Sequence, residues 1–502
     1  MDDFLSCESG IVMRSERCLS YRYDLNQSVL IIDNYVSNQN PEEIAQWIEN
    51  FALLERVGQR IDNWEGRFHE LEVLNGFDHT GAAVSFGVRD YTIQNHRYCA
   101  QVGWLLRHRA ARGQKFIREM VFYGCWVDIF CRSAFDTEEL NKSTSKTAGC
   151  YRFNDASVRL SIVELKEVIT PLGEVVDKCY AMKAVFSRPL ELTEALQVYE
   201  HVETFLKFAA YWGHAYIQWV ELVLCDDTQE QFEGVLVTSK PVVNPDALAT
   251  PFSVVFPWFI FKDKTAFFLE RITEGALPTR HLPQTKEDLR KFTFDRLVKV
   301  VGAFEQTYRI KYKDAGGRSE HYHRAQQLVD QALENLKEST RAQGLRQEAE
   351  VIRDFQRSIK KWKMGLKEML RKAFADHQHL MQMLFEVRYY WLFYEQTREQ
   401  YVNEWAERLS DCRNGSVHQT INSPQTSDMM DDLFLLDELI LIMWFAISGI
   451  DDETIKSYGC YPIDGDLDSG IAKRDWYALV AMNEIFLERE GISLFPPLPQ
   501  NS

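Results

Sequence analysis

Residues 405–419, WAERLSDCRNGSVHQ, place an arginine and a histidine, Arg413 and His418, five positions apart at the edge of a helical pattern. Asn414-Gly415 follows the arginine and is a helix-stop signal, because both residue types tolerate left-handed backbone angles. Three apolar residues before it have the spacing of one helix face: Val402, Trp405 and Leu409. The stretch therefore predicts a packed helix that ends at Asn414-Gly415 and has Arg413 in its last turn.

Helical patterns extend outward from this stretch on both sides. Residues 323–411 are almost continuously helical in pattern, which is too long for one helix, and Gly344 and Gly365 are the expected breaks. Residues 433–448 form a very apolar run with Asp437 and Glu438 inside it. Two adjacent acids make a membrane span improbable, so we expect a buried helix of a bundle and no membrane partner.

The first 300 residues show a different pattern, rich in strand signals. Residues 41–59 and, most clearly, 192–213 predict helices, whereas 143–149 predicts a loop. Strands are expected at 29–33, 83–88, 120–130, 158–163, 179–187, 216–225 and 232–238. The expected class is α+β, with a β-rich N-terminal domain (1–300), a helical domain (301–470) and a tail (471–502).

Composition restricts the function further. Lys and Arg number 57 against 74 Asp and Glu, giving a formal charge of −17, which argues against a general nucleic-acid coat protein. The ten cysteines show no zinc-ligand spacing. They are typical of reduced thiols, and the first residues lack a leader pattern, so we expect a cytoplasmic protein without metal or other cofactor.

Arg413 and His418 suit the cleavage of RNA. The 2′-hydroxyl is the nucleophile, and imidazole can move its proton because its ordinary pKa is about 6.5. A guanidinium binds phosphate through two hydrogen bonds and keeps its charge. Three other Arg/His pairs have comparable spacing: Arg89/His96, Arg318/His323 and Arg371/His377. The Arg371 pair is set aside because it is predicted to lie mid-helix without a turn between its members.

The arginine, adjacent Asn414 and histidine between helices resemble the signature of the HEPN ribonuclease families. The order of a β-rich region and a HEPN-like helical bundle resembles the ApeA-like anti-phage HEPN proteins. The resemblance implies a metal-independent endoribonuclease that leaves a 2′,3′-cyclic phosphate on tRNA or mRNA. It implies Arg413 as phosphate ligand, His418 as acid and base and Asn414 as an orienting group. It also implies a homodimer acting as a toxin or abortive-infection effector, restrained by an antitoxin or released by a phage trigger.

A basic stretch precedes this motif and predicts a weaker RNA contact, although a solvated helix face explains it equally well. Its candidate residues, together with one arginine of the motif helix, are Lys360, Lys361, Lys363, Lys367, Arg371 and Arg408. Two alternatives stay open. One is a non-catalytic HEPN-like module that binds RNA or a partner, and the other is a ligand sensor acting through the N-terminal domain.

Overall fold

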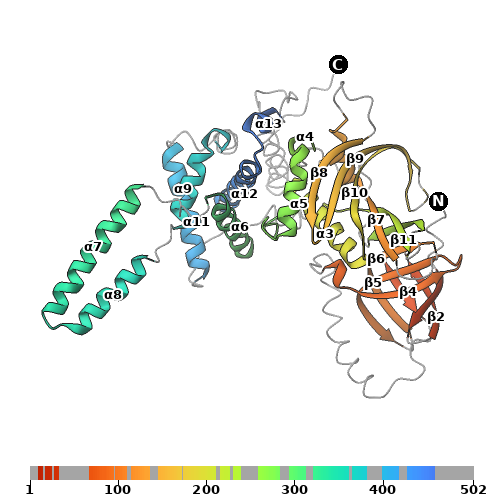
Figure 1. Cartoon of the computed structure of the whole chain (residues 1–502), viewed down its shortest axis with the longest axis horizontal. Coiled ribbons are helices and arrows are strands. Elements are labelled where there is room, and N and C mark those ends of the chain that lie inside the picture. The colour runs from red at the N-terminus through yellow and green to blue at the C-terminus, as the bar shows by residue number, and fades with distance from the viewer. Residues whose placement is uncertain are drawn as a thin grey trace, which may run out of the picture. The chain divides into compact units, whose positions relative to one another are not determined.

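The structure is a computed structural model that divides into two compact units, residues 1–285 and 286–502. Each unit is described by itself. The residues described are 9–14, 17–24, 28–32, 67–94, 97–109, 115–135, 145–171, 173, 175–210, 215–226, 230–238, 258–282, 293–312, 320–360, 365–381, 398–417 and 427–457. A β-rich region followed by helices confirms the α+β class (Figure 1).

A closed barrel of six antiparallel strands forms the first half of the N-terminal unit. Its strands are β1 (Ser9–Arg14), β2 (Arg17–Asp24), β3 (Val29–Ile32), β4 (Glu72–Asp78), β5 (Ala83–Gln94) and β6 (Arg97–His108). The ring closes because β3 pairs with β6 as well as with β2. Alternate residues point inward and form a core that includes Tyr21, Phe86 and Tyr98.

The second half of this unit is a sheet that continues from β6 of the barrel. The order is β12 (Gln231–Thr238), β11 (Trp219–Asp226), β7 (Lys115–Tyr123), β10 (Val175–Leu190), β9 (Ala156–Ile169) and β8 (Ser145–Phe153). A helical layer of α2 (Cys125–Arg132), α3 (Leu192–Ala210) and α5 (Thr265–Thr273) packs against β7, β10 and β8. The short α4 (Trp258–Phe261) adds Phe261 to a cluster with Phe130, Phe205 and Phe268.

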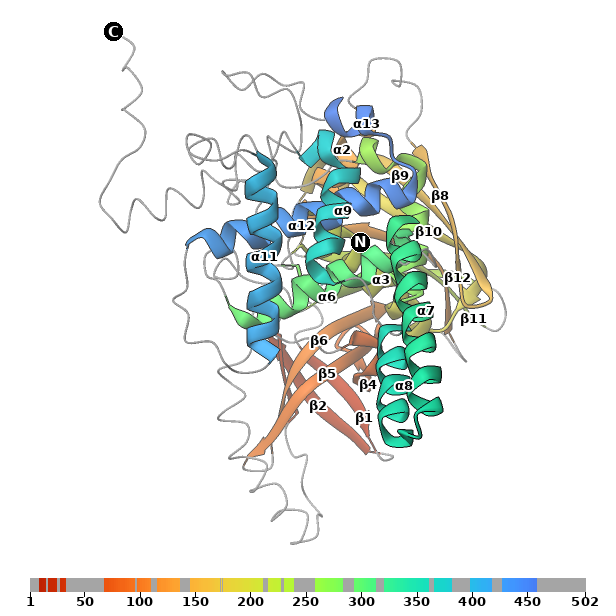
Figure 2. The ribbon, with the colours of Figure 1, turned by 90° about the vertical axis from the view of Figure 1, so that its left-hand side faces the viewer.

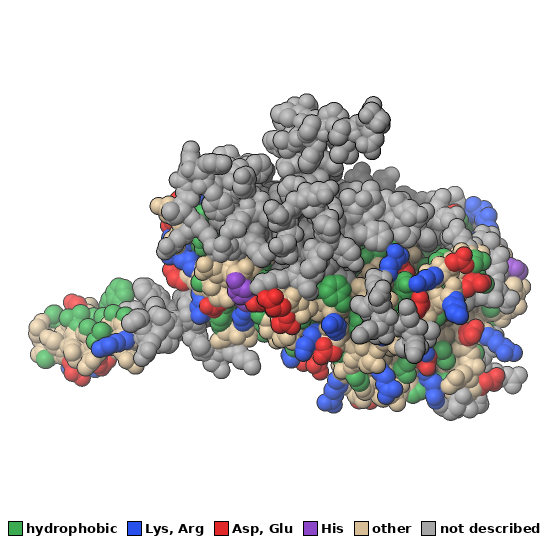
Figure 3. All heavy atoms as spheres, turned by 90° about the horizontal axis from the view of Figure 1, so that it is seen from above, with side chains coloured by type: hydrophobic (Ala, Val, Ile, Leu, Met, Phe, Trp, Pro, Cys, Tyr) green, Lys and Arg blue, Asp and Glu red, His purple; other side chains and the backbone are tan. Residues whose placement is uncertain are grey.

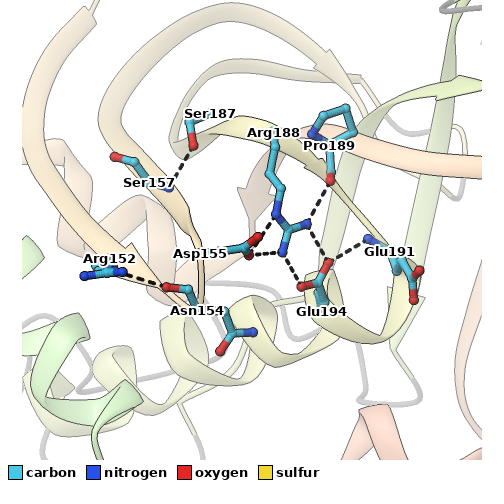
Figure 4. A network of polar contacts seen from close by, with 9 residues as sticks. All are labelled: Arg152, Asn154, Asp155, Ser157, Ser187, Arg188, Pro189, Glu191 and Glu194. Atoms are coloured by element: carbon cyan, nitrogen blue, oxygen red, sulfur yellow. Dashed lines mark hydrogen bonds and ion pairs between the residues drawn. The ribbon is translucent and has the colours of Figure 1, made fainter.

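Arg188 joins the β8–β9 turn to the start of α3 (Figure 4). Its guanidinium donates hydrogen bonds to Asp155 in that turn and to both carboxylate oxygens of Glu194 in α3, at 2.6 and 2.9 Å. The hydrogen bonds from Arg188 lower the pKa of Glu194. Glu194 also accepts the backbone N–H of Glu191 at 3.1 Å, so one carboxylate both caps the helix and holds the arginine.

Two predictions in this unit are wrong. The run 120–130 is a strand only as far as Tyr123, because Gly124 takes a φ of 141° and helix α2 begins directly after it. Its apolar residues are buried as a helix face, and periodicity alone does not distinguish these states in so short a run. The predicted loop 143–149 overlaps strand β8, whose β9 partner supplies the pairing that its own sequence does not indicate.

The second unit contains a packed set of helices, here called the bundle. They are α6 (Phe294–Tyr312), α9 (Leu366–Asp376), α11 (Arg398–Val417) and α12 (Ser427–Ser448), and the short α13 (Asp452–Ser457) follows. Helix α12 is buried on nearly all sides, as expected for its apolar sequence. Asp432, Asp437 and Glu438 of α12 are buried too, and Asp437 accepts a hydrogen bond from Arg296 of α6 at 3.0 Å. No helix in the described part of the chain is both long and apolar enough to cross a membrane.

Helices α7 (Glu320–Ala342) and α8 (Arg346–Lys360) form an antiparallel hairpin in the same unit (Figure 2). The expected breaks are confirmed at both ends of α8. Gly344 turns the chain between the two helices with a φ of 80°, and Gly365 is the N-cap residue of α9. Residue 300, the predicted domain boundary, lies inside α6. The predicted helix 41–59 and the predicted tail 471–502 lie outside the described residues.

Candidate functional site

Helix α11 is fixed in the bundle by aromatic and aliphatic side chains on one face. Trp405 and Leu409 are fully buried, and the Trp405 ring lies 6.0 Å from that of Phe374 on α9. The indole N–H of Trp405 donates to the backbone carbonyl of Asp432 on α12 at 3.1 Å. This packing determines where the polar residues of α11 lie.

Arg408 of the same helix forms an ion pair with the buried Asp432 of α12. Its guanidinium donates two hydrogen bonds to the Asp432 carboxylate, at 2.8 and 2.9 Å, and Asp432 is fully buried. A third hydrogen bond of 3.2 Å goes to the hydroxyl of Tyr401, whose ring lies under the guanidinium. The bonds to Asp432 raise the pKa of Arg408. Arg408, predicted as a weak RNA contact, therefore ties α11 to α12 in this structure.

Arg413 lies in the last turn of α11. The helix continues through Asn414-Gly415 to Val417, so the predicted stop at Asn414-Gly415 is wrong. Asn and Gly each cost under about 1 kcal/mol relative to alanine in a helix, and tertiary packing easily offsets that near a helix end. Asn414 is exposed, and its side-chain oxygen lies 3.4 Å from the Arg413 guanidinium.

The surroundings of Arg413 differ from those of Arg408. The Arg413 side chain is 41% exposed, and its guanidinium lies 3.5 Å from the carboxylate of Glu305 on α6. Glu305 also accepts a hydrogen bond from Arg309, one turn further along α6, at 3.2 Å. Two arginines from different helices thus converge on one carboxylate.

Glu305 and Arg309 were not singled out by the sequence. Their spacing of four residues is a common helical ion pair and gives no sign of a site. The contact with Arg413 bridges more than a hundred residues, and only the packing of α6 beside α11 creates it.

The other predicted residues are placed only in part. His418 follows directly after α11 and lies outside the described residues, as do Lys361 and Lys363. Lys360 is the last residue of α8, and its side chain is not described. Lys367 of α9 donates to Glu407 of α11 at 2.7 Å, and Arg371 lies one turn beyond it, half-buried. The predicted basic stretch therefore divides between α8 and α9.

A second polar cluster lies at the far end of α9. Lys311 of α6 contacts Nε2 of the buried His377, and burial together with the nearby Lys311 charge lowers the pKa of His377 to about 4. Tyr312 donates to Asp376 at 2.6 Å. The prediction that Arg371 and His377 both lie mid-helix is wrong for His377, because α9 ends at Asp376 and His377 is its C-cap residue. Burial and the contact with Lys311 exclude that pair instead.

Within the described residues, no group of three or more His, Cys, Asp and Glu side chains could hold a metal ion. No family model, curated protein or solved structure matches the chain. The function must therefore be inferred from the residues themselves.

Proposed function

We propose that the helical unit is a metal-independent endoribonuclease of the HEPN type. Arg413 binds the scissile phosphate, His418 transfers protons, and Asn414 orients the arginine. The observation that carries the proposal is the placement of Arg413: its side chain is 41% exposed near the end of a helix that the fully buried Trp405 and Leu409 fix in the bundle. The chain therefore presents a guanidinium from a fixed support, five residues before the histidine.

The reaction follows from these groups. Imidazole removes the proton of the 2′-hydroxyl, whose oxygen attacks the adjacent phosphorus while the bond to the 5′-oxygen breaks. The leaving oxygen receives a proton, and a 2′,3′-cyclic phosphate remains. Negative charge grows on the phosphoryl oxygens in the transition state, where a bidentate guanidinium stabilises it most effectively. A second protomer would supply a second Arg/His pair, as the resemblance implies.

The proposed RNA path is narrow. Lys367 and Arg371 lie on α9, which packs against α11, and Lys367 also donates to Glu407 of α11. Arg408 is not part of this path, because Asp432 already binds its guanidinium. A chain with a formal net charge of −17 repels nucleic acid at a distance. A small basic region on such a chain favours binding of one selected tRNA or mRNA over binding of RNA in general. In a host this activity fits a restrained toxin or anti-phage effector.

One observation favours a second candidate, a non-catalytic module that binds RNA or a partner. Glu305 lies where it competes with a phosphate for Arg413. An anionic ligand that displaces this carboxylate would bind at the same place without being cleaved.

Incubation of the purified chain with an RNA pool in EDTA distinguishes the two candidates. We expect discrete fragments with 2′,3′-cyclic phosphate ends from the wild type and at least about a hundredfold less cleavage by Arg413→Ala or His418→Ala, as for loss of one transition-state contact. The matched control is Arg271→Ala, an arginine of similar exposure, 36%, that also pairs with a glutamate. RNA that is bound but not cut by the wild type would favour the non-catalytic module.

A further inference from the structure

The α7–α8 hairpin buries polar side chains and exposes apolar ones. Between its helices, Lys337 and Gln356 are only 9% and 8% exposed, and both donate hydrogen bonds to Glu334, at 2.5 and 3.0 Å. Leu328 and Phe355 are 62% and 61% exposed. Burial of apolar side chains is the main driving force of folding, so an exposed set of this size is costly unless something covers it.

Four exposed apolar residues lie towards one side of the hairpin, here called the apolar face: Val329 and Leu336 of α7, and Val351 and Phe355 of α8. At 3.6 residues per turn, Val329, Leu336 and Phe355 lie roughly a quarter to a third of a turn from the line of contact between the helices, and Val351 lies somewhat further round. The apolar residues are rotated from the contact line in the same direction about each helix axis. Because the two helices run antiparallel, the apolar residues of both point to the same side of the hairpin. Figure 3 shows hydrophobic side chains gathered along the hairpin.

This geometry is that of half a four-helix bundle. In such a bundle each helix contacts two neighbours, on faces about a quarter turn apart. Here each helix uses one such face for its partner in the hairpin and presents the other to solvent. The apolar positions of α7 recur as Ala325, Val329, Ala332 and Leu336, the alternating spacing of four and three residues that forms the seam of a coiled coil.

Charge indicates which partner fits. Helix α7 carries four acids and three bases, and α8 carries three acids and four bases, so the hairpin is neutral in a chain of −17. Nucleic acid or an anionic membrane would require a basic face, and a basic protein would require an acidic one. A neutral face meets a copy of itself without net repulsion, and a two-fold axis that sets α7 over α8 brings the slightly acidic helix against the slightly basic one.

We propose that the apolar face is a homodimerisation surface, on which the hairpin of a second copy of this chain docks to complete a four-helix bundle. The surface is distinct from the Arg413 corner, and the proposal does not depend on the ribonuclease activity. If the ends of α11 also pair, the two contacts together give an assembly larger than a dimer.

The molar mass of the full chain in solution, measured by sedimentation or light scattering, tests the surface. The test variant is Leu336→Glu with Phe355→Glu, which puts two charges on the apolar face. The control is Gln327→Glu with Gln331→Glu, which adds the same charge to exposed positions of α7 away from that face. We expect an oligomer for the wild type and control, and half that mass for the test variant.

A monomeric wild type would overturn the proposal, and so would a test variant of unchanged mass. Circular dichroism checks that the test variant keeps its helices. If it does not, Phe355→Ala serves instead, and the dissociation constant should rise roughly tenfold or more, as for an apolar anchor at the centre of an interface. Hydrogen exchange gives a second readout: amides of α7 and α8 should gain protection as wild-type concentration rises. Protection that does not depend on concentration would also contradict the proposal.

Discussion

The bundle and the α7–α8 hairpin both consist of helices with apolar residues at helical spacing. They differ in the side chains that they bury, which are mainly apolar in the bundle and include polar ones in the hairpin. In the bundle, Trp405 and Leu409 are fully buried, and the buried Asp432 and Asp437 each pair with an arginine. In the hairpin, Lys337 and Gln356 are buried while Leu336 and Phe355 are exposed. The difference teaches that periodicity identifies an apolar face but not what covers it. The bundle covers its faces within the chain, and the hairpin leaves one for a partner.

A large effect on stability is expected from the ion pair between Arg408 and the buried Asp432 in the bundle. Asp432→Ala leaves the Arg408 guanidinium without its carboxylate, and because the Arg408 side chain is 33% exposed and partly solvated, we expect a loss of about 2–4 kcal/mol in the free energy of unfolding. Urea unfolding followed by tryptophan fluorescence measures it. The control, Glu350→Ala, breaks the exposed Arg353–Glu350 pair of the hairpin and should cost under about 1 kcal/mol. Equal losses would contradict the assignment of Asp432 to the core.

The same substitution in each region makes the comparison direct. Leu409→Ala removes a fully buried side chain and should cost about 2–5 kcal/mol. Leu336→Ala removes a side chain that is 52% exposed, so at low protein concentration it should change stability by no more than about 0.5 kcal/mol. At high concentration its cost should grow, because the dimer is then lost as well. A large cost at every concentration would mean that the chain itself covers the apolar face.

Acid should weaken the bundle through His377. Its pKa is about 4 in the folded chain and about 6.5 when unfolded, so unfolding takes up a proton between these values. The stabilisation is complete above pH 6.5 and is lost as the pH falls towards 4, by at most about 3 kcal/mol. His377→Gln should flatten the fall in unfolding free energy over this window. His379→Gln, which leaves the contact of His377 with Lys311 in place, should preserve it. A fall of unchanged steepness in His377→Gln would refute this account.

Local sequence patterns predicted the helices and strands well where residues close together in the sequence determine the structure. Helix α3, the division of the long helical region at Gly344 and Gly365, and the burial of the 433–448 run all follow from spacing and glycines. Patterns failed where distant residues decide the outcome. The β3–β6 pairing closes the barrel between segments far apart in the chain, and β8 is a strand because β9 pairs with it.

The candidate site also depends on contacts between distant residues, which local sequence patterns do not predict. Arg413 stands out in the sequence through its neighbours, but a stop signal at Asn414-Gly415 did not end the helix, because packing of Trp405 and Leu409 supports α11 to Val417. Glu305 and Arg309 belong to this corner only because α6 packs beside α11. Arg408 and Arg413 look equivalent in sequence, yet one is bound to a buried aspartate and the other is presented at the helix end.

The most direct test of the central claim, that the Arg413 end of α11 cleaves RNA, is a map of RNA 3′ ends in cells producing wild type, Arg413→Ala, His418→Ala or Arg271→Ala at equal levels. The cells are compared with and without phage challenge. We predict growth arrest and discrete new ends for the wild type and Arg271→Ala alone, and the sequences at those ends identify the substrate. If all four proteins give the same ends in both conditions, the claim is contradicted, and Arg413 serves binding or structure rather than catalysis.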